Sequence, residues 1–254
     1  MTDTTMTRIA SHRGGTLEFG DSTPQGFAAT AKLPLEEVEF DLHPTADGAI
    51  IVHHDATLDR TTDTKGAIAD LPEAVVRNAV IDYGAGGHPL TLAELCAIYR
   101  DSAVDFRCEF KPNAQGRPYP DFIPGVLEML ETEGMLARTT FSSFLIETQD
   151  ALARLTDRPR LWLVSPPVLR QLGAAGVIEM ALAHGIPEIS VLIDCADAEL
   201  QGRARDAGLD FGCFGAHSTT QIDKALEMGV KVFTTDRPSL AIAWRAAFVE
   251  GRTA

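Results

Sequence analysis

Acidic and basic side chains recur two residues apart in two short apolar stretches of the chain. The first stretch carries Glu39 and Asp41, and the second carries Glu109 and Lys111. Residues i and i+2 of a β-strand point to the same face, so each pair is expected to project together. Three carboxylates on one face repel each other unless a hard divalent cation binds their oxygens. The pattern therefore predicts a divalent metal site at Glu39, Asp41 and Glu109.

Two basic side chains belong to the same predicted cluster. Lys111 shares a face with Glu109, and Arg13 follows His12 at the end of an earlier apolar run. Positive groups beside a bound cation stabilise the oxygens of a phosphate ester. A surface ion pair of Lys111, worth at most about 1 kcal/mol, is the weaker interpretation. We therefore expect a small-molecule phosphate ester as the substrate, held in part by Arg13 and Lys111.

Eight predicted strand and helix units position these residues. Short apolar runs alternate with longer runs of helical period, a pattern typical of a parallel sheet with helical crossovers. The predicted strands are Arg8 to Ser11, Glu37 to Leu42, Asp105 to Lys111, Thr139 to Ser142, Arg160 to Val164, Glu188 to Ile193, Asp210 to Phe214 and Val230 to Thr234. The predicted helices are Pro24 to Lys32, Thr91 to Tyr99, Phe122 to Glu133, Leu145 to Leu155, Val168 to Ala183, Ala198 to Ala207, Thr219 to Met228 and Leu240 to Val249. Eight units in 254 residues predict an α/β fold, the (β/α)8 TIM barrel.

One predicted connection is much longer than the others. Residues 55–90 separate the second strand and its hairpin from the following helix, whereas such loops usually have about 2–6 residues. This predicts a small insertion after strand 2, with Gly84, Gly86 and Gly87 near its end. We expect it to form a lid or subdomain over the mouth of the barrel. Residues 1–254 are then a single TIM-barrel domain with an insertion at about 55–90.

Composition limits the partners that the chain can bind. The formal net charge is −14, which disfavours contact with nucleic acid or with an anionic membrane surface. No apolar run is long enough to span a bilayer. The four cysteines lack the spacing of a zinc site and are expected to be buried free thiols. We expect a cytoplasmic protein, and the sequence leaves a homo-oligomer open.

Several short motifs occur in the same order as in a known family. They are His12-Arg13-Gly14, Glu39-Phe40-Asp41, Asp47-Gly48, His54-Asp55, Leu58-Asp59-Arg60-Thr61-Thr62, Glu109-Phe110-Lys111, Ser143-Phe144 and Thr235-Asp236-Arg237-Pro238. Each fragment alone is weak, but together they span nearly the whole chain. In this order the motifs make the chain resemble the glycerophosphodiester phosphodiesterases.

The resemblance implies a fold, a metal site and a reaction. It implies a TIM barrel with a small insertion after strand 2, and Mg²⁺ or Ca²⁺ held by Glu39, Asp41 and Glu109. It also implies an acid/base pair at His12 and His54. We assign His54 as the base and His12 as the acid. The expected reaction is hydrolysis of a glycerophosphodiester to glycerol phosphate and an alcohol.

Two stretches depart from the pattern of the family. Asp21-Ser22-Thr23 stands where the family usually has Glu-Asn-Thr or Glu-Asn-Ser, and the shorter Asp21 is expected to loosen that corner. Phe214-Gly215-Ala216-His217 stands where Trp-Thr-Val-Asn is frequent. We expect Phe214 and His217 to contact the substrate, and this departure keeps a sugar or another small phosphodiester open as the substrate.

Other residues near the predicted site have a structural interpretation. His53 is expected to face away from His54 by strand alternation, and His43 is expected to be a hydrogen-bonded residue of the rim. Asp236 and Pro238 are expected to form only the turn that begins the last helix, as an Asp cap and an initiating proline.

Two further classes of barrel remain as alternatives. A barrel that binds phosphodiesters without turning them over is one, but the motifs around His12 and His54 are intact. An aldolase or isomerase would need a Schiff-base lysine or a lone carboxylate base, and Lys111 is the one well-placed lysine.

The predicted mouth favours a compact substrate over a lipid. Phe144, Trp162 and Phe214 are expected to form an apolar wall that Ser142, Ser143 and His217 interrupt. An acyl chain would need a continuous apolar groove, so we expect soluble phosphodiesters to react faster than lysophospholipids.

Overall fold

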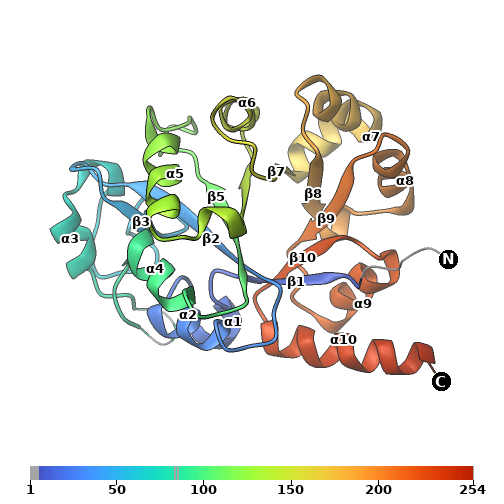
Figure 1. Cartoon of the computed structure of the whole chain (residues 1–254), viewed down its shortest axis with the longest axis horizontal. Coiled ribbons are helices and arrows are strands. Elements are labelled where there is room, and N and C mark those ends of the chain that lie inside the picture. Colours follow the sequence, from blue (N-terminus) through green and yellow to red (C-terminus); the bar gives the residue numbers. More distant parts are fainter. Residues whose placement is uncertain (1–5, 83, 85, 254) are drawn as a thin grey trace.

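A closed ring of parallel strands forms the centre of the computed structural model, which describes residues 6–253 apart from 83 and 85 (Figure 1). The remaining residues lie outside the described part. The ring consists of β1 (Arg8–His12), β2 (Glu37–Pro44), β5 (Asp105–Phe110), β6 (Thr139–Ser143), β7 (Arg160–Val164), β8 (Glu188–Leu192), β9 (Asp210–Phe214) and β10 (Val232–Thr235). Each strand pairs with the next, and β1 pairs with both β10 and β2, which closes the ring. The predicted (β/α)8 TIM barrel is confirmed.

Helices surround the strands (Figure 1). They are α1 (Thr16–Phe19), α2 (Pro24–Thr30), α4 (Leu92–Tyr99), α5 (Phe122–Thr132), α6 (Ile146–Leu155), α7 (Pro166–Ala183), α8 (Ala198–Asp206), α9 (Thr219–Met228) and α10 (Pro238–Thr253). Two of them begin at a proline two residues before the predicted start, because proline is favoured in the first helical turn. Helix α7 is also broken at Gly173, whose φ of 66° leaves the helical region.

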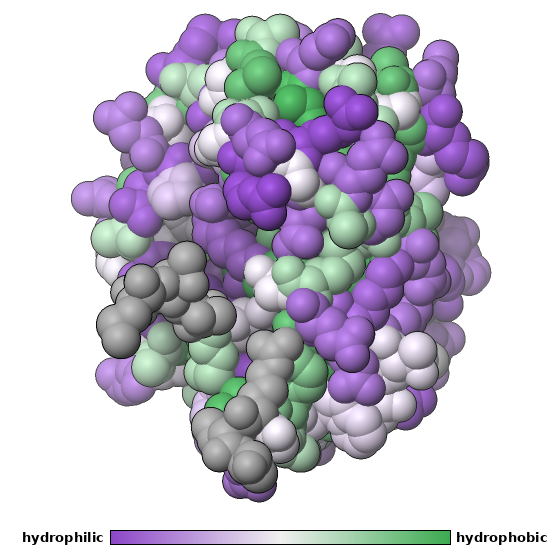
Figure 2. All heavy atoms as spheres, turned by 90° about the vertical axis from the view of Figure 1, so that its right-hand side faces the viewer, coloured by the Kyte–Doolittle hydropathy of each residue, from purple (hydrophilic) through white to green (hydrophobic). Residues whose placement is uncertain are grey.

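Alternation along the strands separates an apolar outer layer from a polar interior. On β2 and β5 the buried apolar side chains Val38, Phe40, Phe106 and Cys108 belong to the main hydrophobic core. The residues between them are charged, and they are buried as well. On the face drawn in Figure 2, hydrophilic side chains predominate and hydrophobic ones are interspersed among them. These two strands therefore direct their charges inward and their apolar residues toward the helices.

The charges at the amino-terminal end of the barrel interior are paired with one another. Arg107 Nε donates to Glu37 Oε2 at 2.6 Å, and Arg107 Nη1 lies 3.4 Å from Glu188 Oε1. Lys231 Nζ donates to Glu188 Oε2. Two carboxylates and two cations thus form a chain of ion pairs, which we call the lower cluster (Glu37, Arg107, Glu188, Lys231).

The predicted insertion is present after β2. The segment from β3 (Ile50–Val52) to β4 (Leu90–Thr91) contains a 3-10 turn at Ile68–Asp70 and α3 (Glu73–Asn78). β3 pairs antiparallel with β2, and β4 with β3. A separate small hydrophobic cluster holds the segment together, formed by Ile51, Leu58, Ile68, Val76 and Ala79. The insertion therefore extends the sheet sideways from β2, on the left in Figure 1.

The four cysteines are free thiols, as predicted. Cys96, Cys108 and Cys213 are buried, and Cys195 is half-buried. Among the helices that the structure describes, none combines the length and apolar character needed to cross a membrane.

Candidate active site

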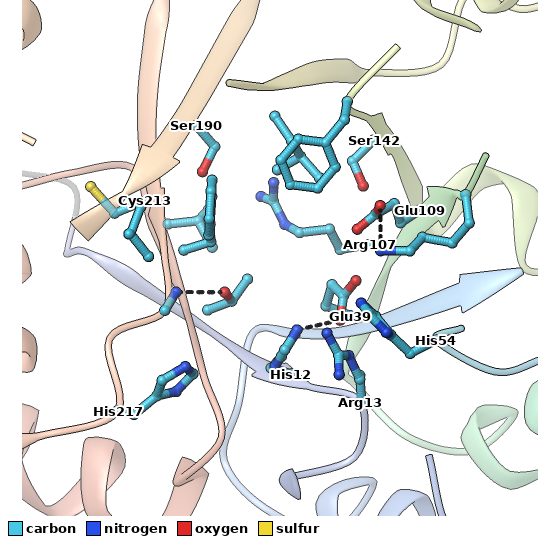
Figure 3. A pocket seen from close by; sticks show the side chains of 18 residues that line it. His12, Arg13, Glu39, His54, Arg107, Glu109, Ser142, Ser190, Cys213 and His217 are labelled. Atoms are coloured by element: carbon cyan, nitrogen blue, oxygen red, sulfur yellow. Dashed lines mark hydrogen bonds and ion pairs between the residues drawn. The ribbon is translucent and has the colours of Figure 1, made fainter. Parts of the chain in front are cut away.

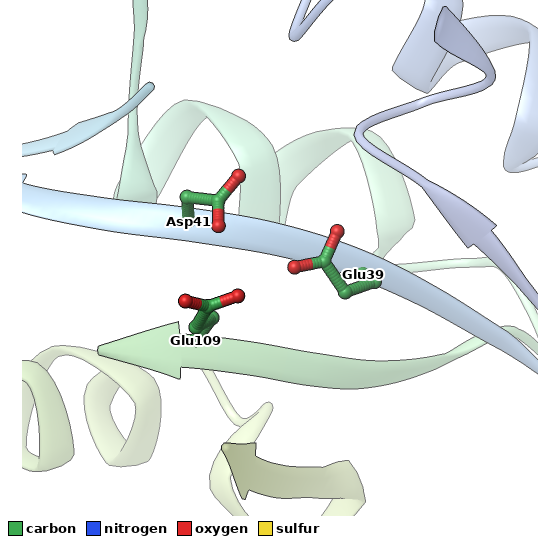
Figure 4. A group of neighbouring side chains, drawn as sticks. All are labelled: Glu39, Asp41 and Glu109. Carbon is green, nitrogen blue, oxygen red and sulfur yellow. The ribbon is translucent and has the colours of Figure 1, made fainter. Parts of the chain in front are cut away.

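Three carboxylates meet inside the carboxyl-terminal half of the barrel. Glu39 and Asp41 extend from β2, and Glu109 extends from β5, where it is the register partner of Asp41. Figure 4 shows the three side chains pointing toward one another, and they offer oxygens within 4.8 Å of each other. Both oxygens of Asp41 and Oε2 of Glu39 are buried without a hydrogen-bond partner. We call these three residues the acidic triad.

The acidic triad is costly to ionise by itself. Burial raises the pKa of Glu39 well above its ordinary value, and Asp41 and Glu109 raise it further. Burial also raises the pKa of Glu109 to about 7 against the opposing charge of Lys111. For Asp41, burial is outweighed by Lys111, His54 and Arg13, which hold its pKa below the usual range. Buried carboxylate oxygens without partners fit a hard divalent cation.

Two basic side chains border the acidic triad. Lys111 Nζ lies 2.9 Å from Glu109 Oε1 and 3.4 Å from Asp41 Oδ1. Arg13 Nε lies 3.3 Å from Asp41 Oδ2, while its Nη1 donates to Asp21 at 3.1 Å. Both basic residues line the pocket. They supply positive charge beside the place where a cation would bind.

His12 and His54 are each oriented by a carboxylate. His12 Nδ1 donates to Asp236 Oδ1, and His54 Nδ1 donates to Asp55 Oδ1, both at 2.5 Å. A carboxylate accepts only, so each Nδ1 carries a proton and each Nε2 is left for other partners. Burial lowers the pKa of His54. Figure 3 shows the two histidines and Arg13 on one side of the pocket, opposite Ser142 and Ser190.

Asp236 has a role that the sequence did not suggest. Besides holding His12, it donates its backbone N–H to Nδ1 of His217 at 3.0 Å, so the proton of a neutral His217 lies on Nε2. The expectation that Asp236 only caps the last helix is wrong. Glu18 accepts from the first amides of α10, those of Ser239 and Leu240. The Thr-Asp-x-Pro motif was the available signal.

The other two histidines beside the site are fully engaged in hydrogen bonds. Nε2 of His43 donates to the carbonyl oxygen of His54, so its Nδ1 accepts from the Tyr119 hydroxyl at 2.8 Å. Burial lowers the pKa of His43 to about 4. His53 donates to the carbonyl oxygen of Asp55 and accepts from Thr61. As expected, neither lies among the residues that line the pocket.

The corner at Asp21 is tighter than expected. Asp21 is buried, and its carboxylate accepts from Arg13, from Arg60 at 2.9 Å and from the Ser22 hydroxyl. The expectation of a loose corner is wrong, because Arg60 reaches across from the insertion and binds the Asp21 carboxylate.

The pocket above the acidic triad has a volume of about 210 Å³ and combines charged and apolar walls. The predicted substrate-binding residues Arg13, Lys111, Phe214 and His217 all line it, together with His12, His54, Glu39 and Glu109. The Phe144 and Phe214 rings meet edge to face at 5.8 Å. No residue of the insertion from 55 to 90, as far as it is described, lines the pocket, so the expected lid over the mouth is not observed.

The apolar wall differs in composition from the expected one. Trp162 and Ser143 do not line the pocket, since the Trp162 indole donates to the carbonyl oxygen of Phe144 and the Ser143 hydroxyl to that of Phe110. Leu163 and Leu192 line it instead. Sequence reasoning missed both leucines because an apolar residue in a strand looks the same whether it faces a core or a pocket.

Known proteins with this fold and these motifs can be named. The sequence model of the Glycerophosphoryl diester phosphodiesterase family matches residues 12–240. A solved protein from Agrobacterium tumefaciens, provisionally named a glycerophosphoryl diester phosphodiesterase, is 64% identical, with a TM-score of 0.95 over 98% of this chain and 100% of that one. A glycerophosphodiester phosphodiesterase of Caldanaerobacter subterraneus is 29% identical over 143 residues, which is 54% of this chain and 58% of that protein.

A more distant structure carries a bound product. An Oleispira antarctica phosphodiesterase, solved in complex with the product sn-glycerol-3-phosphate, is 19% identical to this chain. The TM-score is 0.80, over 94% of this chain and 96% of that one. At this identity the likeness shows the shared fold.

Proposed function

Because the chain belongs to the glycerophosphoryl diester phosphodiesterase family, we propose that it hydrolyses a glycerophosphodiester to glycerol phosphate and an alcohol. The observation that carries the proposal is the acidic triad, with unpartnered buried oxygens, beside two histidines that carboxylates orient. Glu39, Asp41 and Glu109 would hold Mg²⁺ or Ca²⁺. When bound, such a cation stabilises the negative charge that builds on the phosphoryl oxygens.

His54 is the proposed general base. Its Nδ1 proton is held by Asp55, which leaves the Nε2 lone pair at the pocket. Burial lowers the pKa of His54, so the ring is neutral at pH 7 and can accept a proton. That proton comes from the attacking hydroxyl, either of water or of the substrate's glycerol 2-hydroxyl. In the second case a cyclic phosphate forms first, and a water molecule opens it to glycerol phosphate.

His12 is the proposed general acid. Its Nδ1 donates to Asp236, and its Nε2 lies 3.8 Å from Glu39 Oε2, so both N–H groups of a protonated ring face carboxylates. The Nε2 proton passes to the alkoxide as the phosphorus–oxygen bond breaks. Arg13 and Lys111 bind the nonbridging oxygens.

The pocket supports a compact, soluble substrate. A volume of about 210 Å³ is below the roughly 300–1,000 Å³ of pockets that take drug-sized ligands. The apolar wall of Phe144, Leu163, Leu192 and Phe214 suits the carbon skeleton of a small alcohol. A sugar phosphodiester is the second candidate, since Nε2 of His217 offers a hydrogen-bond donor for a hydroxyl.

The test is a substrate panel under one salt condition, with added Mg²⁺, added Ca²⁺ or excess EDTA. We expect the highest kcat/KM for glycerophosphocholine or glycerophosphoethanolamine, and loss of turnover in EDTA that added cation reverses. Full activity in excess EDTA would remove the metal from the proposal. A sugar phosphodiester or lysophosphatidylcholine ranking first would replace the proposed substrate.

A further inference from the structure

Arg60 belongs to the insertion and does not line the pocket, yet it holds two carboxylates of the site. Its Nε donates to Asp55 Oδ2 at 2.5 Å, and its Nη2 lies 3.2 Å from Asp55 Oδ1. The same Nη2 donates to Asp21 Oδ2 at 2.9 Å. One guanidinium therefore joins the start of the insertion to the corner that follows β1.

Each of these carboxylates also holds a residue of the site. Asp55 accepts from Nδ1 of His54, the proposed base, and Asp21 accepts from Nη1 of Arg13. The Arg60 guanidinium is thus the shared partner of Asp55, which holds the proposed base His54, and of Asp21, which holds the proposed phosphate-binding Arg13. In the described part of the chain no other side chain bonds to both carboxylates.

The two histidine–carboxylate pairs differ in how the carboxylate is restrained. The Asp236 side chain is 13% exposed, whereas the Asp55 side chain is 25% exposed and so more accessible to solvent. An exposed carboxylate can turn away from its histidine unless a second partner fixes both of its oxygens. A planar guanidinium does this with two parallel N–H bonds, a geometry that lysine lacks.

We propose that Arg60 is a positioning residue, which fixes the Nδ1 acceptor of His54 and the phosphate-binding orientation of Arg13 at once. The inference rests on the proposed function and deepens it. It assigns the insertion a part in the reaction through Asp55 and Asp21, although no described residue between 55 and 90 faces the pocket.

The kinetic test compares Arg60→Met with Arg77→Met. Arg77 is the matched control, a half-exposed arginine of the same insertion that pairs with Glu73 and Glu94 away from the pocket. We expect Arg60→Met to lower kcat about 10- to 100-fold, the usual effect of removing such an outer partner, and to raise KM through Arg13. Arg77→Met should change both constants less than about twofold. An Arg60→Met enzyme that also stays within about twofold would overturn the proposal.

Two further variants distinguish the loss of the Arg60 contacts with Asp55 and Asp21 from a general loss of structure. Arg60→Lys keeps the charge but not the two parallel hydrogen bonds of the guanidinium, so it should recover only part of kcat. Full recovery of kcat would contradict a role for this bidentate geometry. The double variant Arg60→Met/Asp55→Asn should be less impaired than the product of the two single losses, because both act on His54. Fully multiplicative losses would contradict action through Asp55.

A measurement without substrate keeps this inference separate from the proposed function. The pKa of His54 is followed by NMR in wild type, Arg60→Met and Arg77→Met. The charged groups that act on His54 are Asp41, Lys111, Arg13 and Asp55, and none of them is replaced. Removing Arg60 leaves Asp55 unneutralised, so the pKa should rise in that variant alone. An unchanged pKa would overturn the positioning role of Arg60, whereas a raised pKa without any phosphodiester turnover would leave it standing and reject the proposed function.

Discussion

The two ends of the barrel interior treat buried charge in opposite ways. At the amino-terminal end, the lower cluster pairs two carboxylates with two cations in direct ion pairs. Two residues further along the same strands, the acidic triad leaves buried oxygens without hydrogen bonds. β2 supplies Glu37 to the lower cluster and Glu39 to the triad, and β5 supplies Arg107 and Glu109 in the same way.

The difference separates charges that support the structure from charges that bind. The charges of a buried ion pair are already neutralised and so bind a ligand weakly, and removing one partner destabilises the protein. In the acidic triad three carboxylates face only two nearby cations, Lys111 and Arg13, and several oxygens have no hydrogen bond. This excess of negative charge makes the metal-free protein less stable but leaves capacity for a cation. Each end should therefore fail differently when its residues are changed.

The largest expected effect is the loss of catalysis at the carboxyl-terminal end. His12→Ala and His54→Ala should each lower kcat by about 10² to 10⁴, the range for removing a general acid or base. The free energy of unfolding should change little, because both side chains lie at an open pocket. Steady-state kinetics measures the change in kcat, and urea unfolding measures the free energy of unfolding.

A histidine outside the pocket provides the control for this prediction. His184 pairs with Asp150 at 2.8 Å and does not line the pocket, so His184→Ala should leave kcat within about twofold. Equal losses in His184→Ala and His54→Ala would mean that the histidine changes act through the fold.

The second effect is a loss of stability at the amino-terminal end. Arg107→Met removes the buried cation shared by Glu37 and Glu188, which keep only the part-exposed Arg8 and Lys231 as partners. Removing one partner of a buried pair costs about 3–5 kcal/mol. The exposed pair of Arg100 and Glu133 is the control, and Arg100→Met should cost less than about 1 kcal/mol. The denaturant midpoints of the two variants measure these losses of stability. Similar midpoints would break the proposed contrast between the ends.

The third effect concerns the carboxylate that the sequence interpretation missed. Asp236→Asn keeps the shape beside His12 but weakens the restraint on its Nδ1–H, so kcat should fall about 10- to 100-fold, less than in His12→Ala. The double variant with His12→Ala should lose no more than His12→Ala alone. An additional loss in the double variant would assign Asp236 a role independent of His12.

The smallest effect is a pH dependence of the metal-free protein. The pKa of Glu109 is raised from 4.5 in the unfolded chain to about 7, so the native state binds the extra proton between these values. This contribution to stability is present below about pH 4.5 and is lost as the pH rises through about 7. In EDTA the free energy of unfolding should therefore fall steadily over this range.

Glu109→Gln is the control for the pH dependence. The substitution removes the titrating group, so the slope between pH 4.5 and 7 should become smaller in EDTA. A slope identical to that of the wild type would assign the raised pKa to another member of the acidic triad. Glu39 is then the residue to replace, because its pKa is raised in the same direction.

Local patterns in the sequence predicted the barrel and the acidic triad well. Strand alternation alone places Glu39 beside Asp41, and the closed sheet brings Glu109 to them as a register neighbour. The role of Asp236 could not be found in this way, because its partner His12 lies 224 residues away. Its position before Pro238 also fits an ordinary helix start.

The sequence predicted where the insertion occurs in the chain but not where it lies relative to the barrel mouth. Its length and glycines indicate a separate segment, yet composition does not say whether such a segment covers a mouth or lies beside it. Here β3 and β4 attach it to the side of β2, and a small apolar cluster of its own holds it there. The reach of Arg60 to Asp21 spans 39 residues and depends on that attachment.

The closure of the ring has a consequence for the order in which the protein is made. β1 is synthesised well before its partner β10, and the contacts of Arg245 with Thr7 and Glu36 form later still. Contacts between such distant segments form late in folding. Because the carboxylate that orients His12 directly follows β10, a growing chain gains its complete acid/base pair only when translation has passed Asp236. Until then the ring stays open between β1 and β10.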